Sequence, residues 1–242
     1  AFHYTSYDNP YLSQEAFAIL MVDMSQESIR KEIMAEDEVL SPTLLVYGCW
    51  DERVCRVPRF RIPTSWPVYV GHDFGQANPA ALFLAQDSGT GYIYTWAEYL
   101  PGPGRNVFDH VEEFKEITKG TNVLKRVGGN RTTEDETRQA YGANGWPIAA
   151  PVFKEVKRQV EAVRVLMGQN RWFVFDDMKH YLAELASCMW ELDETGKPLD
   201  KIRDEERFHL CAAARYIGSD FKPVGIKSSQ PVTKKAAWRF GG

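Results

Sequence analysis

Two side chains able to hold a divalent cation stand far apart in this chain. Asp73 ends the apolar run that begins at Val68, and Gly75 follows two positions later. His209 lies near the other end of the sequence. Magnesium and manganese prefer oxygen ligands. Two such ions can flank a phosphodiester, one activating water and the other stabilising the leaving oxygen. These residues therefore indicate metal-dependent phosphodiester hydrolysis as one possible chemistry.

The motif around Asp73 has a second interpretation. Asp-x-Gly is short, and it also occurs in kinases and actin-like ATPases. A turn aspartate that hydrogen-bonds its own backbone explains the residue equally well. A carboxylate at the exit of a rigid buried strand is nevertheless well placed to bind a metal. His209 alone is more often a structural helix residue, although Ala212 shares its helix face.

Further carboxylates lie between these two points. Glu134, Asp135 and Glu136 follow Thr133, and the pattern Thr-x-x-Glu is a capping box that explains these acids without a metal. Asp176 and Asp177 stand between a strand and a helix, where Asp177 is expected to cap the helix that begins at Met178. Glu134 is assigned as the second metal carboxylate, with capping as the alternative for it.

The surrounding sequence predicts elements that would position these side chains. Three consecutive antiparallel strands are expected, with Asp73 at the exit of the first. Strands and helices alternate after them. The expected order is strands at 68–73, 80–85 and 92–100, a helix at 107–119, a strand at 123–127, a helix up to 141, a strand at 146–149, a helix at 153–167, a strand at 171–175, a helix at 178–190, a hairpin at 191–200 and a helix at 205–218. This is the order of a mixed, RNase H-like α/β sheet flanked by helices.

Composition bounds the remaining possibilities. The chain has 242 residues and a net charge of -4, so no overall field draws it to DNA or to an anionic membrane. No apolar run approaches a membrane span. Cys49 and Cys55 lack a second pair with zinc-site spacing, which favours free thiols over a metal site. Because the chain begins with Ala1, we expect a piece of a longer protein.

Four segments resemble the large terminase subunit of tailed bacteriophages. The similarity covers its C-terminal nuclease domain and a short piece of the preceding ATPase domain. The last segment resembles a closing His-x-x-Asp-Ala-x-Arg-Tyr signature. The segments are Phe2–Leu12, Val70–Gly75 with Asn78–Ala81, Gly128–Glu134 with Trp146–Ile148, and His209–Tyr216. Expected domains are residues 1–65 as ATPase-domain tail, helices and linker, 66–221 as nuclease, and 222–242 as a basic tail.

The resemblance implies an endonuclease of the viral DNA-packaging motor that cuts concatemeric double-stranded DNA with little sequence preference. It implies two Mg or Mn ions held by Asp73, Glu134, His209 and an acid at position 212. This chain has Ala212 there. An introduced inactivating substitution and natural divergence both explain that departure. A second departure is the pair Gly128 and Gly129, where many relatives carry an acid.

The implied partners are DNA, the portal protein, the small terminase subunit and the upstream ATPase domain, in the host cytoplasm. Lys125, Arg126 and Arg131 are expected to contact DNA phosphates, with a solvated surface as the alternative for each. No glycine-rich phosphate loop is present in the sequence. A catalytically silent module that clamps DNA and docks on the portal is the second hypothesis, favoured by Ala212. An actin-like ATPase is the third, and it lacks its second phosphate loop.

Overall fold

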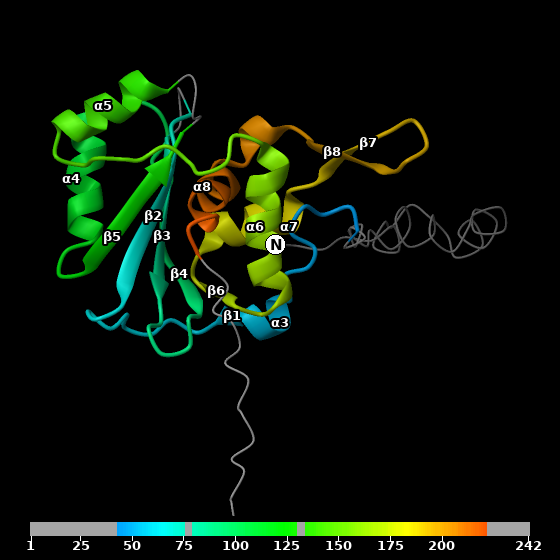
Figure 1. The fold of residues 1–242 in the computed structure, drawn as a ribbon, viewed down its shortest axis with the longest axis horizontal. Helices are drawn as coiled ribbons and strands as arrows, with labels where there is room; N and C mark the ends of the chain where they lie inside the picture. Colours follow the sequence, from blue (N-terminus) through cyan, green and yellow to red (C-terminus); the bar gives the residue numbers. More distant parts are fainter. Residues whose placement is uncertain (1–42, 76–78, 130–133, 222–242) are drawn as a thin grey trace, which may run out of the picture.

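A six-stranded mixed sheet with helices on both faces forms the body of the molecule (Figure 1). The computed structural model describes residues 43–75, 79–129 and 134–221. The sheet order is β1-β6-β4-β3-β2-β5. Its strands are β1 (Arg56–Val57), β2 (Pro67–Asp73), β3 (Ala80–Gln86), β4 (Ile93–Tyr99), β5 (Asn122–Gly128) and β6 (Trp172–Phe175).

Helices α4 and α5 cover one face of the sheet, and α6, α7 and α8 cover the other (Figure 1). Each layer has its own cluster of buried apolar side chains. The helices are α3 (Glu52–Cys55), α4 (Val107–Ile117), α5 (Asp135–Ala143), α6 (Val156–Gly168), α7 (Lys179–Ser187), the 3-10 turn η3 (Glu205–Arg207) and α8 (His209–Gly218). A separate hairpin of β7 (Trp190–Leu192) and β8 (Pro198–Ile202) projects from this body (Figure 1).

The three consecutive antiparallel strands expected from the sequence are confirmed as β2, β3 and β4. β5 pairs with β2 in parallel, and β6 pairs with β4 in parallel. The mixed RNase H-like sheet is therefore confirmed as well. Because β2, β4, β5 and β6 run in the same direction, their carboxyl ends lie toward one end of the sheet. Asp73 is the last residue of β2 at that end.

Alternation along β2 sends its side chains to different layers. Val68 and Val70 belong to the cluster beneath α4 and α5. Gly71 lies on the opposite face, where a Cβ atom would stand 2.1 Å from the carbonyl oxygen of Ala213. The backbone of α8 therefore packs directly on β2. Two residues further along, Asp73 shares that face and so meets the first turn of α8.

Two expected elements differ in the structure. The strand expected at residues 146–149 is reduced to one parallel bridge between Val127 and Ala149, flanked by hydrogen bonds of 3.0 and 2.9 Å. Residues 43–66, expected to form a linker, contribute α3 and also β1, which pairs with β6. β1 is too short to show a periodic pattern, and its partner β6 is distant in sequence, so local sequence does not predict this strand.

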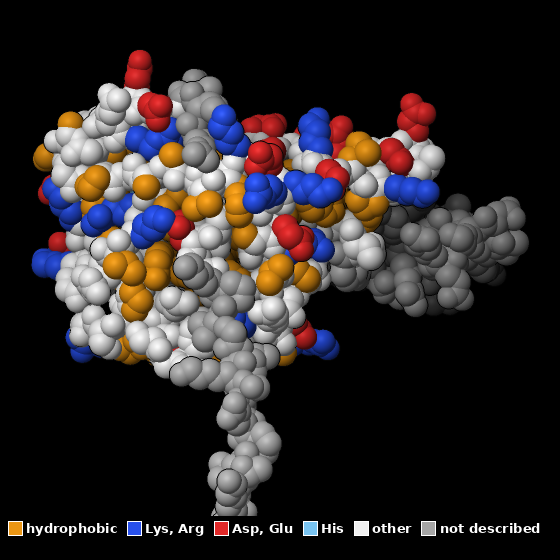
Figure 2. Space-filling view, viewed as in Figure 1, with side chains coloured by type: hydrophobic (Ala, Val, Ile, Leu, Met, Phe, Trp, Pro, Cys, Tyr) orange, Lys and Arg blue, Asp and Glu red, His pale blue; other side chains and the backbone are white. Residues whose placement is uncertain are grey.

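All four cysteines lie within the described residues, and none forms a disulfide. None of the helices in the described ranges combines the length and apolar character needed to cross a bilayer. Acidic and basic side chains are interspersed on the face shown in Figure 2.

Candidate functional site

Asp73 and His209, 136 residues apart in sequence, meet at the carboxyl end of β2. The Nδ1 atom of His209 lies 2.8 Å from the Oδ2 atom of Asp73. Their side chains are 17% and 20% exposed, so a ligand in solution can reach both. The hydrogen bond to Asp73 raises the pKa of His209 above its usual value, against the opposing effect of burial. A metal ion bound here would have to displace any proton on this imidazole.

The position of His209 depends on how α8 begins. Phe208 occupies the N-cap and makes no side-chain cap. Instead, the Glu184 carboxylate from α7 accepts hydrogen bonds from the backbone N–H groups of Leu210 and Cys211, at 3.2 and 2.8 Å. These are two of the amide groups that a helix N-terminus leaves without intrahelical partners. Glu184 therefore fixes the turn that carries His209.

The N-terminus of α7 is also capped by a carboxylate from another element. Its N-cap residue, Met178, makes no side-chain cap. The Glu98 carboxylate from β4 accepts hydrogen bonds from the backbone N–H groups of His180 and Tyr181, at 3.0 and 2.8 Å. Sequence reasoning missed both Glu98 and Glu184. For α8 the available signal was that Phe208, rather than Ser, Thr, Asp or Asn, precedes the helix, so its cap had to come from elsewhere. For α7 the sequence offered Asp177, which hid the role of Glu98.

Glu184 is itself buried. Desolvation raises the pKa of Glu184 to about 7, while its hydrogen bonds to the amides of Cys211 and Leu210 act in the opposite direction. Its two oxygens are directed at α8.

Glu134 lies at the same end of the sheet. It occupies the N-cap of α5 without making a side-chain cap, so α5 begins one residue later than the Thr-x-x-Glu box predicts. A Cβ atom added to Gly129 would stand 2.8 Å from a Glu134 carboxylate oxygen and 2.4 Å from the Phe74 ring. Burial chiefly raises the pKa of Tyr216, and the charges of Asp73 and Glu134 both add to that rise. Glu134 and Asp73 therefore face a common region beside α8.

Three ligands do not gather at one point. Within the described ranges, no group of three or more His, Cys, Asp or Glu side chains is arranged to hold a metal ion. Ala212, one turn after His209 on α8, is 4% exposed and supplies no donor atom. The site of this chain thus combines one carboxylate and one imidazole in contact, with a second carboxylate nearby.

Two neighbouring acids, Asp177 and Asp135, form ion pairs with arginines. Asp177 forms an ion pair with Arg59, and Met178 rather than Asp177 is the N-cap of α7. The expected cap by Asp177 is therefore wrong. The Arg138 guanidinium donates to Asp135 at 2.6 Å and to the Gly128 carbonyl at 3.0 Å.

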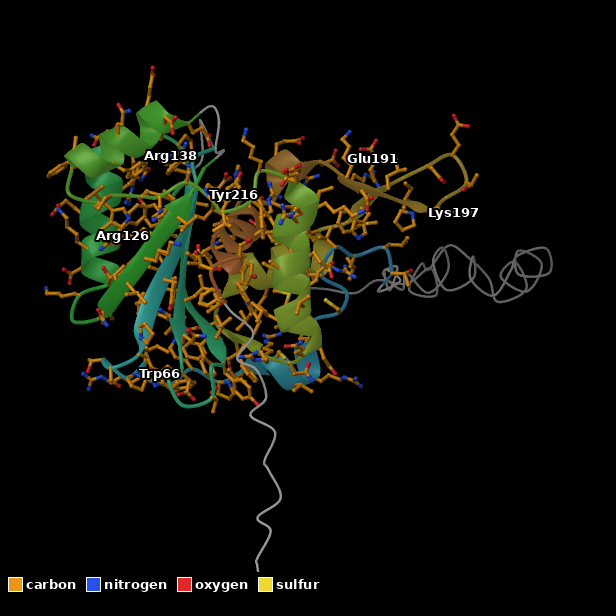
Figure 3. The ribbon with its side chains drawn as sticks, in the orientation of Figure 1. Trp66, Arg126, Arg138, Glu191, Lys197 and Tyr216 are labelled. Carbon is orange, nitrogen blue, oxygen red and sulfur yellow. The ribbon has the colours of Figure 1, made fainter. Side chains whose placement is uncertain are left out.

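The lysine and arginine expected to contact DNA lie along β5 rather than at its end. Arg126 pairs with Val70, and its guanidinium stacks on the Trp146 ring at 4.1 Å. Lys125 forms an ion pair with Asp220. Figure 3 places Arg126 below Arg138 and Tyr216, which lie nearer the carboxyl end of the sheet. Arg131 falls outside the described residues.

On the other side of β2, His72 is buried in an aromatic cluster. The Trp146 Nε1 atom donates to the His72 Nε2 atom at 3.1 Å. Burial lowers the pKa of His72 to about 3. The ring is therefore neutral, and it supports the strand that ends in Asp73.

The sheet order, the two helical layers and the acidic strand end define an RNase H-like fold of the nuclease type. Solved structures of phage large terminases share this fold. A large terminase from a thermophilic bacteriophage superposes with a TM-score of 0.62 at 16% identity, over 90% of this chain and 55% of that chain. The P22 large terminase nuclease domain gives a TM-score of 0.58 at 17% identity, over 72% of this chain and 90% of that one.

The large terminase nuclease from thermophilic phage G20c with bound magnesium gives a TM-score of 0.52 at 18% identity, covering 70% of this chain and 96% of that chain. No protein-family model matches this sequence, and no curated protein matches it. The chain therefore has the fold of a phage terminase nuclease domain, as the sequence resemblance predicted. It spans about half the length of the first large terminase described above.

Proposed function

We propose that this chain is the metal-dependent endonuclease module of a viral DNA-packaging motor, acting on concatemeric double-stranded DNA. The observation that carries the proposal is the 2.8 Å contact between His209 and Asp73 at the carboxyl end of β2. It occurs within the fold of terminase nuclease domains. A carboxylate at the exit of a sheet strand, beside a helix that presents the His209 imidazole, suits binding of divalent cations.

Asp73, Glu134 and His209, with an acid at position 212, would hold two Mg or Mn ions. When bound, such ions supply an activated water and stabilise the leaving oxygen of a phosphodiester. The magnesium-bound G20c nuclease supports the choice of metal. The residue types fit, but the set is incomplete because the Ala212 methyl group donates nothing. We therefore expect this chain to bind metal weakly and to cleave DNA poorly or not at all.

Replacing Ala212 with Asp tests the assignment directly. His209 and residue 212 share one face of α8, so the new carboxylate would join the Asp73–His209 pair. We expect Ala212→Asp to nick supercoiled plasmid in manganese while the parent chain does not. Ala212→Asp combined with Asp73→Asn should lose this activity again. If Ala212→Asp leaves plasmid intact while it still binds manganese in calorimetry, the nuclease assignment is wrong.

Cleavage should show little sequence preference, because recognition through phosphates carries no base information. The upstream ATPase domain, the portal protein and the small terminase subunit are the proposed partners, in the host cytoplasm. The ATPase domain is suggested by the large terminase that this chain matches over 55% of that protein's length.

Ala212 favours a second candidate, a catalytically silent module that clamps DNA and docks on the portal. This candidate shares the fold and DNA binding, but it requires no metal. It predicts that duplex binding is unchanged by manganese and that Ala212→Asp stays inactive. The plasmid assay above therefore separates the two.

A further inference from the structure

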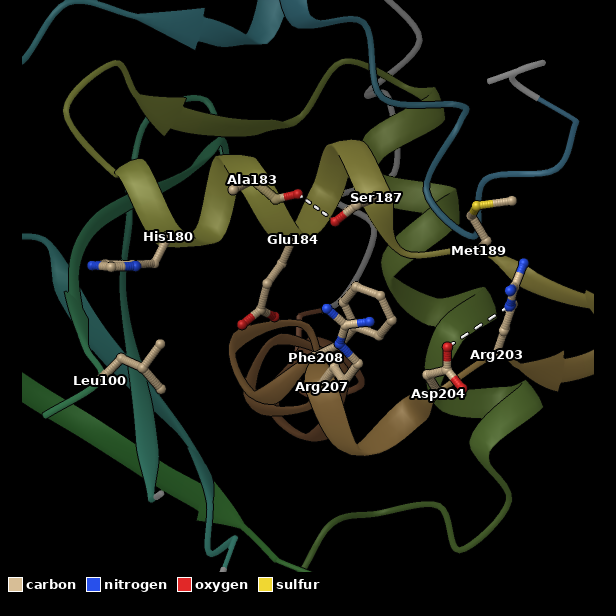
Figure 4. A pocket seen from close by; sticks show the side chains of 10 residues that line it. All are labelled: Leu100, His180, Ala183, Glu184, Ser187, Met189, Arg203, Asp204, Arg207 and Phe208. Atoms are coloured by element: carbon tan, nitrogen blue, oxygen red, sulfur yellow. Dashed lines mark hydrogen bonds and ion pairs between the residues drawn. The ribbon is translucent and has the colours of Figure 1, made fainter. Parts of the chain in front are cut away.

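A groove lies between α7 and η3 (Figure 4). Its volume is about 430 Å³. It is lined by Leu100, His180, Glu184, Arg203, Arg207 and Phe208, among others. Phe208 directly precedes His209, which places one wall of the groove against the candidate site.

The strand register fixes the distance between groove and site. Asp73 pairs with Ala80, and Ala81 pairs with Tyr99, so Leu100 follows opposite Ala80. Leu100 thus lies two strands from Asp73, roughly 10 Å away at the usual spacing between strands. A DNA strand bound at Asp73 would therefore reach this groove within a few nucleotides.

Two basic side chains of the groove are available to an anion. Among the described residues, the side chains of Arg207 and His180 have no hydrogen-bond or ion-pair partner, and both residues are exposed. The two acids in the lining are already engaged. Asp204 lies 3.7 Å from Arg203, and the Glu184 oxygens accept from the α8 amides.

The other basic groups near the site already contact protein side chains. Lys125 pairs with Asp220, Arg138 donates to Asp135, and Arg215 pairs with Glu205. Arg126 stacks on Trp146. Arg207 and His180 are therefore the better placed donors for a phosphate group.

We propose that this groove binds the DNA backbone next to the scissile phosphate, with Arg207 and His180 as its phosphate contacts and the Phe208 ring as its apolar wall. The proposal rests on the proposed function, since it requires DNA at Asp73. It adds two phosphate contacts to those predicted for Lys125 and Arg126. Phosphate contacts of this kind position a strand without reading its sequence.

Binding can be measured without cleavage. Fluorescence anisotropy of a short labelled duplex in EDTA would compare the parent chain, Arg207→Ala, Arg207→Glu and His180→Ala across a range of salt concentrations. Loss of the Arg207 contact should flatten the log–log salt slope by about 0.9 and weaken binding about fivefold at ~0.15 M salt. His180→Ala should weaken binding through a lost hydrogen bond. Arg207→Glu should weaken binding further than Arg207→Ala.

Arg53→Ala is the matched control. The Arg53 side chain is 90% exposed in α3, which precedes β1 and so lies at the opposite end of the parallel strands. We expect its affinity and salt slope to equal those of the parent. Equal losses in Arg53→Ala and Arg207→Ala, or parent-like binding by both Arg207 variants, would overturn the groove assignment.

The two proposals fail separately. If Ala212→Asp nicks plasmid while the Arg207 variants bind like the parent, the groove assignment is wrong and the nuclease function stands. A parent chain that does not bind duplex also overturns the groove, and plasmid cleavage by Ala212→Asp then decides the function independently. Circular dichroism of each variant checks that an exposed change in η3 leaves the fold intact.

Discussion

Replacing Gly71 with Ala tests how the site is assembled. A Cβ atom at this position would stand 2.1 Å from the carbonyl oxygen and 2.8 Å from the carbonyl carbon of Ala213, and 3.0 Å from the Ile217 Cγ2 atom. Real Cβ contacts essentially never fall below 3.0 Å. The first two clashes are with helix backbone, which no rotamer change can relieve. α8 must therefore move away from β2 by nearly an ångström.

Overpacking of a well-packed core costs about 1–3 kcal/mol. The upper end applies at Gly71 because a whole helix must shift, and the predicted loss is about 3 kcal/mol. In a protein of this size, that loss lowers the melting temperature by about 6–12 °C. The same shift separates His209 from Asp73, so Gly71→Ala in the Ala212→Asp background should also lose manganese affinity and plasmid nicking.

Urea unfolding of the parent chain and Gly71→Ala, followed by tryptophan fluorescence and circular dichroism, measures the loss. Gly142→Ala is the matched control, since a Cβ atom there meets nothing within 4 Å. Because Gly142 lies inside α5, that substitution should be neutral or stabilise by up to about 1 kcal/mol. A Gly71→Ala variant as stable as Gly142→Ala would refute the direct packing of α8 on β2.

Two further predictions concern pH. His72 has a folded-state pKa of about 3 and an ordinary value of 6.5, so only the unfolded chain binds a proton between them. Stability should therefore fall as pH drops from 6.5 toward 3, by on the order of 4–5 kcal/mol from this group. His72→Gln should flatten that slope in urea unfolding at several pH values, and an unchanged slope would contradict the burial argument. Glu184, with a pKa raised to about 7 from 4.5, holds a proton in the folded state where the unfolded chain has lost it. Stability should fall by about 3 kcal/mol as pH rises from 4.5 to 7. Glu184→Gln should abolish this dependence, and a parent-like pH profile would show that desolvation does not dominate at Glu184.

Much of the fold follows from local patterns in the sequence. Apolar runs separated by turn residues identified β2, β3 and β4, and the acid that ends the first run fell at the carboxyl end of β2. The three-residue spacing placed His209 and Ala212 on one helix face. These inferences succeed because short apolar runs bounded by turns form buried strands, and because side-chain direction repeats every 3.6 residues in a helix.

Other features depended on contacts between distant segments. β1 pairs with β6, 118 residues later in the register from Arg56 to Val174, and no local period announces it. The basic residues of β5 illustrate the same limit. Lys125 and Arg126 were predicted as phosphate contacts, and this stays a prediction; only the folded chain shows that Lys125 pairs with Asp220 and that Arg126 stacks on Trp146.

The sequence by itself determined that an acidic strand end and a histidine helix exist, and it determined that position 212 carries no acid. Only the tertiary structure decided that Asp73 and His209 touch. That contact requires Gly71, whose missing side chain admits the backbone of α8, and Glu184, whose carboxylate holds the amides of its first turn. Helix caps and close backbone approaches between elements depend on three-dimensional proximity. A one-dimensional pattern of residue types does not encode that proximity directly.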